Sequence, residues 1–278
     1  MENTMSEYFI INRQVRQTSF KMDHTHLHDC YELIYLLSGE CNLLMNHKIY
    51  KMQPGSIVMI PPGVIHKSAY GNNDKVKQER AIARFSLKDI DWICSVLDRQ
   101  TVLENLKDAI VEVPEKRRDY VEGLITGIIH EYGIQDEFSP CEVKALFQEL
   151  ILFILRCRKY GESVVRELDT DDRTIQEIAT YIYENFEKQI YLDDVAKKFN
   201  ISRSYLSKKF KATTGMGFKE YLLNVRIKDA CRRLLETNES ITEIAFGCGF
   251  NDSNYFGDAF RRIKGISPNK YRHNKEVV

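Results

Sequence analysis

The sequence lacks the features that mark several special classes of protein. Among its 278 residues no apolar run approaches the ~20 residues that span a bilayer. The opening segment, MENTMSEYFIIN, has neither the basic region nor the apolar core of a secretory signal. A composition of 43% hydrophobic and 29% charged residues excludes collagen-like and low-complexity chains. We therefore expect a globular cytoplasmic protein with no membrane partner.

Paired cysteines and common catalytic motifs are also missing. The 7 cysteines are scattered and form no C-x-x-C pair. An odd, unclustered set is typical of reduced thiols in a cytoplasm rather than of disulfides or a zinc knuckle. The sequence also contains no nucleophile–base pairing and no glycine-rich phosphate loop. These absences point away from most enzyme classes.

The net charge of the whole chain is zero, but two parts of the chain carry large and opposite charges. The 40 basic and 40 acidic residues cancel, but from Lys188 to Lys275 there are 18 basic and 9 acidic residues, a net charge of +9. The rest of the chain then carries 22 basic and 31 acidic residues, a net charge of −9. A basic segment beside an acidic one is typical of a nucleic-acid-binding module joined to another domain. A chance fluctuation is the alternative.

The length predicts two domains. Residues 8–85 contain short apolar runs separated by glycine and proline turns, which favours a small antiparallel β-barrel. Further along, the spacing becomes helical, and an apolar stripe over 143–155 either packs on the barrel or forms a dimer surface. We predict an α+β chain with an N-terminal domain over 1–165, a linker over 166–173 and a helical domain over 174–278.

An internal repeat is the strongest signal in the sequence. Segments that start at Leu192 and Ile241 match at offsets of 49 and then 50 residues. Each has a small alanine, then a turn residue that tolerates positive φ, then an apolar residue, as two helices crossing over a tight turn require. The pairs are Ala196 with Ala245, Asn200 with Gly249, Ile201 with Phe250, Tyr205 with Tyr255, Leu206 with Phe256, Phe210 with Phe260 and Gly215 with Gly265. The sequence therefore predicts two helix-turn-helix motifs.

A helix is predicted between the two copies, over 218–236. Its 19 residues span ~28 Å at the rise of an α-helix, close to the ~34 Å between successive major-groove faces of B-DNA. Ser202 is expected to cap the first recognition helix, and Ser240 with Glu243 to form a capping box in the second motif. A plain helical bundle would explain the apolar spacing, but neither the duplication nor the charge.

The C-terminal part of the sequence resembles a known family. The segment from Arg226 to Arg272 resembles the DNA-binding signature of AraC/XylS-type transcription regulators, and the similarity extends over about 174–272. The most specific elements are Ile244-Ala245, Gly249-Phe250, Tyr255-Phe256, Phe260, Gly265, Pro268 and Tyr271-Arg272. The resemblance implies a seven-helix domain that binds double-stranded promoter DNA, usually activates transcription and has RNA polymerase as a partner.

The resemblance also implies which residues face DNA. The groove-facing positions are Arg203, Ser204, Ser207 and Lys208 in the first recognition helix and Ser253, Asn254, Gly257 and Asp258 in the second. Arg203 and Lys208 suit guanine, and Asn254 suits adenine. Asp258 departs from the basic or polar residue that is frequent in the family, so either it accepts from cytosine or the second motif makes few base contacts. Phosphate contacts without base reading are expected for Lys209, Lys211, Arg261, Arg262 and Lys264.

The N-terminal half carries a second constellation of polar residues. Residues two apart on a strand share a face, so His24, His26, His28 and Glu32 are expected to point to one side, with His66 approaching from a second strand. Three imidazoles and a carboxylate suit a transition metal or zinc. The spacing resembles the two motifs of cupins, β-barrels in which such groups bind metal. The sensor domains of AraC/XylS-type regulators are also cupin-like, and there such residues often line a pocket without metal.

Two functions from different classes follow. The favoured hypothesis is a ligand-responsive transcription regulator, an activator as the resemblance implies, whose cupin-like barrel senses a small molecule such as a sugar and requires no cofactor. The alternative is a metal-dependent cupin enzyme whose basic tail localises it to DNA. A third hypothesis is a regulator in which the barrel serves only as a scaffold for a homodimer.

Overall fold

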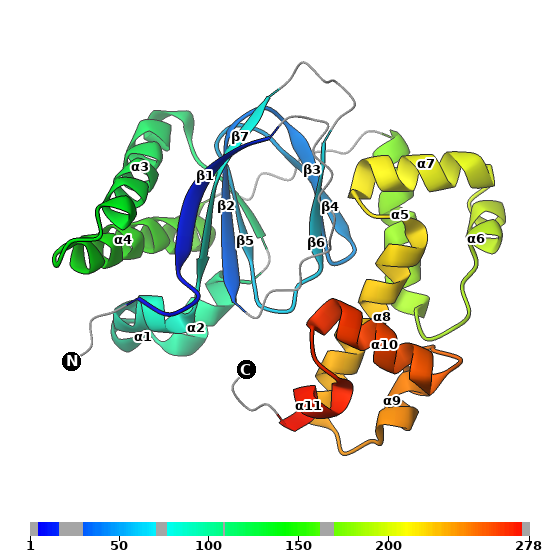
Figure 1. Cartoon of the computed structure of the whole chain (residues 1–278). Coiled ribbons are helices and arrows are strands. Elements are labelled where there is room, and N and C mark those ends of the chain that lie inside the picture. The colour runs from blue at the N-terminus through cyan, green and yellow to red at the C-terminus, as the bar shows by residue number, and fades with distance from the viewer. Residues whose placement is uncertain (1–4, 17–29, 71–76, 108, 162–169, 274–278) are drawn as a thin grey trace.

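The computed structural model describes residues 5–16, 30–70, 77–107, 109–161 and 170–273 (Figure 1). Two antiparallel sheets face each other and enclose a barrel interior; their strand orders are β1-β7-β2-β5-β8 and β4-β3-β6. The strands are β1 (Ile10–Arg16), β2 (Tyr31–Ser38), β3 (Cys41–Met45), β4 (Lys48–Met52), β5 (Ser56–Ile60), β6 (His66–Tyr70), β7 (Gln78–Phe85) and β8 (Ala109–Glu112). The predicted β-rich N-terminal domain is confirmed.

Alternation along the strands separates two apolar cores. On β2, Leu33 and Tyr35 pack outside the barrel, beneath a layer of helices. Their neighbours Ile34 and Leu36 belong to the core inside the barrel. Both faces of this strand are therefore buried, which is why it reads as a nearly continuous apolar run in the sequence.

Helices cover the outer face of the five-stranded sheet (Figure 1). They are η1 (Leu87–Ile90), α1 (Asp91–Val96), α2 (Arg99–Asn105), η2 (Glu115–Arg117), α3 (Arg118–Ile134) and α4 (Ser139–Tyr160). Along α4, Phe147, Leu150 and Ile154 are fully buried against the sheet. The stripe over 143–155 therefore packs on the barrel, and the alternative that it forms a dimer surface is wrong, because its side chains are already covered within the chain.

Strand β8 was not predicted, because the pattern from about residue 88 onward indicates helices. It pairs antiparallel with β5, with Ile110 opposite Val58. A strand of 4 residues is too short to display a periodicity of its own. Its conformation depends on the edge of the sheet that it completes.

The C-terminal domain consists of helices, seven of them between Thr170 and His273. They are α5 (Thr170–Asn185), α6 (Leu192–Lys198), α7 (Arg203–Thr214), α8 (Phe218–Glu236), α9 (Ile241–Gly247), α10 (Ser253–Lys264) and α11 (Pro268–His273). The predicted 218–236 helix has the bounds of α8. None of the helices in the described ranges is long and apolar enough to cross a membrane.

Helix α5 begins at Thr170, inside the predicted linker over 166–173. The apolar spacing of this helix starts only at Ile175, so its first turn shows no amphipathic pattern. Acidic residues such as Asp172 in that turn are stabilised by the helix dipole. The helical unit therefore extends at least four residues further toward the N-terminus than the predicted 174.

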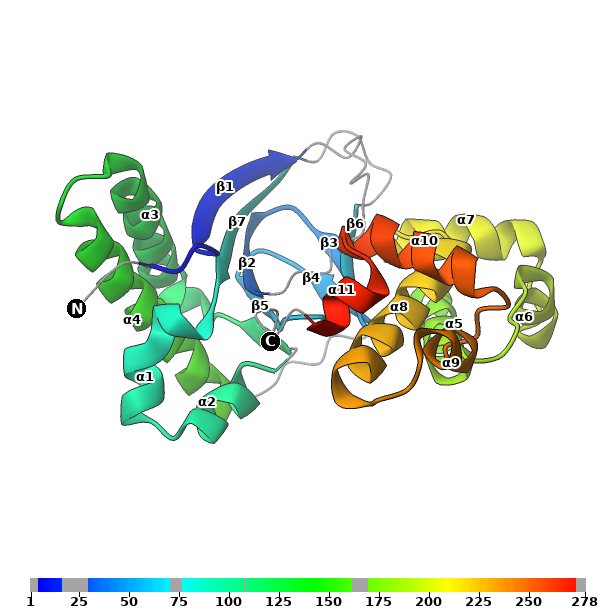
Figure 2. The ribbon, with the colours of Figure 1, turned by 60° about the horizontal axis from the view of Figure 1, so that its bottom comes forward.

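The three-stranded sheet packs against the helical domain (Figure 2). Leu44, Ile49 and Ile65 share one apolar core with residues of α5, α7 and α8. The β3–β4 turn adds polar contacts: the Ile49 N–H donates to Gln176 Oε1 (2.5 Å), and Gln176 Nε2 donates to the His47 carbonyl (2.6 Å). The outer surface of the barrel therefore packs directly against the first half of the helical domain.

Candidate nucleic-acid interface

The first helix-turn-helix consists of α6, a short turn and α7. Ala196 is buried where the helices meet, and Asn200 in the turn adopts φ 53°, as its residue type predicts. Ser202 caps α7, because its Oγ accepts from the Tyr205 N–H (3.1 Å). Leu206 and Phe210 are fully buried. The inward face of α7 is therefore fixed, and the opposite face is left to solvent.

The second motif repeats this construction with α9 and α10. Gly249 takes the turn position with φ 83°. Asp252 caps α10 by accepting from the Tyr255 N–H (2.7 Å). The predicted capping box of Ser240 and Glu243 is present, with bonds of 3.1 and 2.7 Å. Both predicted motifs are therefore confirmed, each with its own cap.

The predicted DNA-facing side chains lie on the uncovered faces of α7 and α10. Exposed residues are Arg203, Ser204, Ser207, Lys208 and Lys211 on α7 and Asn254, Asp258 and Arg261 on α10. Ser253 and Gly257 are half-buried. The structure thus brings the two predicted sets to the surface of two matching helices, and contact of each residue with DNA stays a prediction.

Acidic neighbours distinguish the basic residues. Lys209 lies 3.3 Å from Asp172 on α5, and its side chain is only 26% exposed. The phosphate contact predicted for Lys209 therefore competes with an ion pair inside the protein. Arg261 lies 3.9 Å from Asp258, but both side chains are exposed and the pair is weak. Arg261 is accordingly the better candidate for a phosphate contact.

Two exposed tyrosines were not selected from the sequence as DNA-facing residues. Tyr205 and Tyr255 occupy the same position in the two recognition helices, 38% and 56% exposed. The repeat marks them as a matched pair in the sequence. The repeat alone does not show whether these side chains are buried or exposed. In the structure they are surface aromatics beside the predicted groove-facing positions.

Arg226 holds the two motifs together and was also missed. Its Nε and Nη2 atoms donate to the carbonyls of Phe186 (2.9 Å) and Lys188 (2.8 Å), after the end of α5. Burial lowers the pKa of this guanidinium from its usual value. In the same loop, Gln189 Nε2 donates to the Gly249 carbonyl (3.0 Å) in the turn of the second motif. The loop before the first motif therefore contacts the second one directly.

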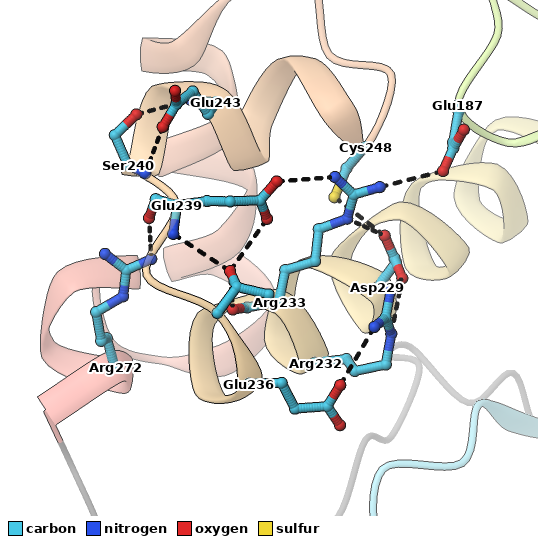
Figure 3. Close-up of polar contacts among 11 residues, drawn as sticks. Glu187, Asp229, Arg232, Arg233, Glu236, Glu239, Ser240, Glu243, Cys248 and Arg272 are labelled. Atoms are coloured by element: carbon cyan, nitrogen blue, oxygen red, sulfur yellow. Dashed lines mark hydrogen bonds and ion pairs between the residues drawn. The ribbon is translucent and has the colours of Figure 1, made fainter.

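Asp229 on α8 is the centre of an ionic network beside the second motif (Figure 3). Its Oδ1 lies 2.7 Å from Arg232 and its Oδ2 lies 2.8 Å from Arg233. Arg233 also reaches Glu187 (3.1 Å), and the Cys248 thiol donates to Asp229 (3.6 Å). Burial, followed by the charge of Asp229, raises the pKa of this thiol to about 12. The network ties α8 to the loop after α5 and to the turn that follows α9.

The predicted barrel constellation is only partly within the described residues. His24, His26 and His28 lie outside them, so the structure does not test their placement. Glu32 and His66 are both buried and face each other, with His66 Nε2 3.7 Å from Glu32 Oε1. Arg84 pairs with the other oxygen of Glu32 (2.9 Å). Two of the five candidate residues thus meet on the inner face of the barrel.

The chemistry of this pair fits a metal only in part. The Nδ1 atom of His66 lies 2.9 Å from the Val64 carbonyl, which only accepts, so Nδ1 is the donor of this hydrogen bond. The Glu32 carboxylate already has Arg84 as a counter-ion. Within the described ranges no group of three or more potential ligands is close enough to hold a metal.

Comparisons with known proteins match both halves of the chain. Residues 13–151 match the profile of the AraC-like ligand binding domain, and residues 195–274 match that of a helix-turn-helix domain. The chain is 23% identical over 247 residues to the HTH-type transcriptional activator RhaR of Mannheimia succiniciproducens, covering 89% of this chain and 86% of the relative. It is 39% identical over 103 residues to the Msm operon regulatory protein of Streptococcus mutans, covering 37% and 36%.

A solved structure is similar to the C-terminal part. The C-terminal domain of AraT, a response regulator from Geobacillus stearothermophilus, is 34% identical and covers 37% of this chain and 85% of that one, with a TM-score of 0.36.

Proposed function

Because this chain belongs to the AraC family of transcription regulators, we propose that its barrel binds a small-molecule effector and thereby controls how the two helix-turn-helix motifs occupy a promoter. DNA binding by the helical domain is the family's function and agrees with its excess of basic residues. The proposal adds that the barrel binds an effector and that this binding controls the contact with DNA.

The observation that carries the proposal is the core shared by the barrel and the first motif. Leu44 and Ile49 of the barrel lie in one apolar cluster with Phe210 of the recognition helix and Tyr221 of α8. Tyr221 also donates to the Asn46 carbonyl in the β3–β4 turn (3.0 Å). A change in the barrel that moves this turn therefore acts on the helix that connects both motifs.

The test is footprinting of the full chain on the promoter of its own gene and of neighbouring genes, at several salt concentrations. We expect protection of two adjacent major-groove segments, and affinity that falls steeply with salt because phosphate contacts release counterions. Effector control predicts that a cell extract containing small metabolites alters the protection. Absence of protection at moderate salt would contradict DNA binding, and protection that no metabolite alters would contradict the barrel's sensing role.

Activation, contact with RNA polymerase and homodimerisation complete the proposal. Relatives are named transcriptional activators, which supports activation through contact with RNA polymerase. A homodimer has to use a surface other than the buried α4 stripe. Sedimentation of the full chain over a range of concentrations measures the mass, and transcription in vitro measures the sign of regulation.

The cupin enzyme is the second candidate function. Among the described residues, the buried Glu32–His66 pair is the feature that supports it. We expect the protein to function without a metal cofactor. Elemental analysis of protein purified without chelator decides between the two: one equivalent of metal per chain would favour the enzyme, and a small fraction of an equivalent would favour the regulator.

A further inference from the structure

Arg80 is a charged residue inside the barrel. It lies on β7 between Gln78 and Ile82, at the positions that alternate toward the interior, and Ile82 belongs to the interior apolar core. Its side chain is buried, with 3% of the residue exposed. The charge therefore does not reach bulk water.

The protein provides little to balance this charge. Arg80 Nη1 donates to the Ser68 hydroxyl (3.1 Å), while its buried Nε atom has no acceptor. Among the described residues no carboxylate forms an ion pair with Arg80. Arg84, four residues further along the strand and on the same face, differs because Glu32 neutralises it at 2.9 Å. The thiol of Cys41 does not supply a negative charge either, because burial raises its pKa.

A buried guanidinium without a counter-ion is strongly destabilising. Proteins retain such groups where a bound partner supplies the missing counter-charge, and this kind of destabilisation is usually found at functional sites. An anion that enters the barrel would supply the counter-charge that the described residues do not provide.

Two amides whose oxygen atoms lack a hydrogen-bond donor lie beside Arg80 on the same inner face. Gln78 is 3% exposed, and its amide oxygen has no hydrogen-bond partner, whereas its amide group lies beside the Cys41 thiol. On the adjacent β1, Asn12 is opposite Ile82 and hence diagonal to Arg80. Its buried Oδ1 atom also has no donor. Amide oxygens accept from hydroxyl groups, and the Gln78 nitrogen donates to them.

We propose that the barrel binds a hydroxylated carboxylate of the sugar-acid class, with the carboxylate on Arg80 and hydroxyl groups on the amides of Gln78 and Asn12. This deepens the proposed function and rests on the barrel being the effector site. A carboxylate carries one negative charge, which one guanidinium balances. A phosphate monoester carries ~1.5 to 2 negative charges at neutral pH and would leave an excess in the barrel.

The first experiment is a thermal-shift assay of the full chain with three sets of probes. Glucuronate, galacturonate and gluconate are the sugar acids; glucose and galactose lack the charge; hexanoate lacks the hydroxyl groups. We expect at least one sugar acid to raise the melting temperature by about 5 °C at ~100 times its Kd, and the other two sets to have little effect. An equal shift with the neutral sugars, or no shift with any of the acids, overturns the inference.

The second experiment replaces the guanidinium. Without probe, Arg80→Met is expected to melt at or above the temperature of the parent chain, because an unbalanced buried charge is replaced by an apolar side chain of similar length. The same variant should lose the shift caused by the acid. Arg13→Met is the matched control, since Arg13 lies on β1 but is exposed and paired with Glu79; it should keep the shift. Clear destabilisation by Arg80→Met would show that the guanidinium has a structural role, as in its hydrogen bond to Ser68, and would contradict the inference.

Failure of this inference is distinguishable from failure of the proposed function. Promoter footprinting of the parent chain and of Arg80→Met in the absence of probe measures DNA binding alone. Protection without any response to sugar acids rejects the ligand class and retains the regulator. Absence of protection by the parent chain contradicts the proposal that the protein is a DNA-binding regulator.

Discussion

At the scale of single residues, Gly249 is constrained both by its backbone conformation and by the backbone atoms around it. Its φ of 83° is unfavourable for a residue with a side chain. A Cβ atom there would lie 2.6 Å from the Phe186 carbonyl oxygen and 2.7 Å from that of Glu187. The glycine is therefore required both by its own turn and by the loop that packs on it.

Gly249→Ala is expected to destabilise the helical domain by about 2–4 kcal/mol, since backbone strain is added to a clash with backbone atoms. Gly265→Ala is the matched control, because Gly265 has φ 76° but no atom within 4 Å of the added methyl. It should cost about 1 kcal/mol. Urea denaturation followed by circular dichroism measures both. Equal losses would show that the close approach at Gly249 relaxes without cost.

Cys248 gives a prediction about pH. With a pKa of about 12 in place of 9.0, its thiolate fraction near neutral pH is roughly a thousandfold lower than that of an ordinary cysteine. We expect iodoacetamide at pH 8 to label the exposed Cys141 long before Cys248, as read by mass spectrometry of peptides. The unfolded chain releases this proton above pH ~9 and the folded chain retains it. Stability should therefore fall between pH 9 and 12, and Cys248→Ala should reduce that fall.

At the scale of elements, α7 offers two lysines with different expected roles. Lys208 is predicted to read a base edge, and Lys211, one turn further along, to contact phosphate. Both are exposed. Lys208→Ala should cost about 1–3 kcal/mol of binding and relax the preference at one base pair. Lys211→Ala should weaken binding equally on all sequences and reduce the salt dependence by about one phosphate contact.

The measurement is a set of binding isotherms on the protected site and on its single-base variants, at several salt concentrations. A uniform loss for Lys208→Ala, with unchanged base preferences, would contradict its assignment as a base-reading residue.

The sequence predicted helices and turns well where local chemistry determines them. The bounds of α8, the cap at Ser202 and the positive φ of Asn200 all follow from short-range patterns. Contacts between distant segments were not predicted. Arg226 reaches carbonyls 38 and 40 residues away, and no periodicity marks such a pairing. For the same reason Arg80 was not selected, since burial of an arginine depends on which face of the strand closes the barrel.

At the scale of the whole molecule, the polar and apolar contacts between barrel and helices form one interface. Lys67 of β6 pairs with Glu220 of α8 (2.9 Å), and Asp172 of α5 accepts from Asn42 of β3 (3.1 Å). Between these contacts lies the apolar core that includes Ile49. The interface uses the outward face of the three-stranded sheet, so it can be altered without touching the barrel interior.

Ile49→Asn is expected to weaken this interface by about 2–4 kcal/mol, because a buried aliphatic side chain is replaced by an amide. Calorimetry should then resolve separate transitions for the barrel and the helical domain. Lys51→Asn is the control, since Lys51 lies on the same strand and outward face but is exposed; its transition should match the parent. Unchanged cooperativity in Ile49→Asn would mean that the two domains are coupled elsewhere.

The division of α8 between two cores has a consequence for the DNA. Tyr221 and Val225 belong to the core of the first motif, whereas Ala230 and Leu234 belong to that of the second. One continuous helix therefore fixes the rotation of one motif relative to the other. The two half-sites of its DNA target must therefore lie at a fixed angle to each other around the duplex axis. An insertion of about five base pairs between the two half-sites turns one of them to the far side of the duplex, and only one motif can then engage at a time.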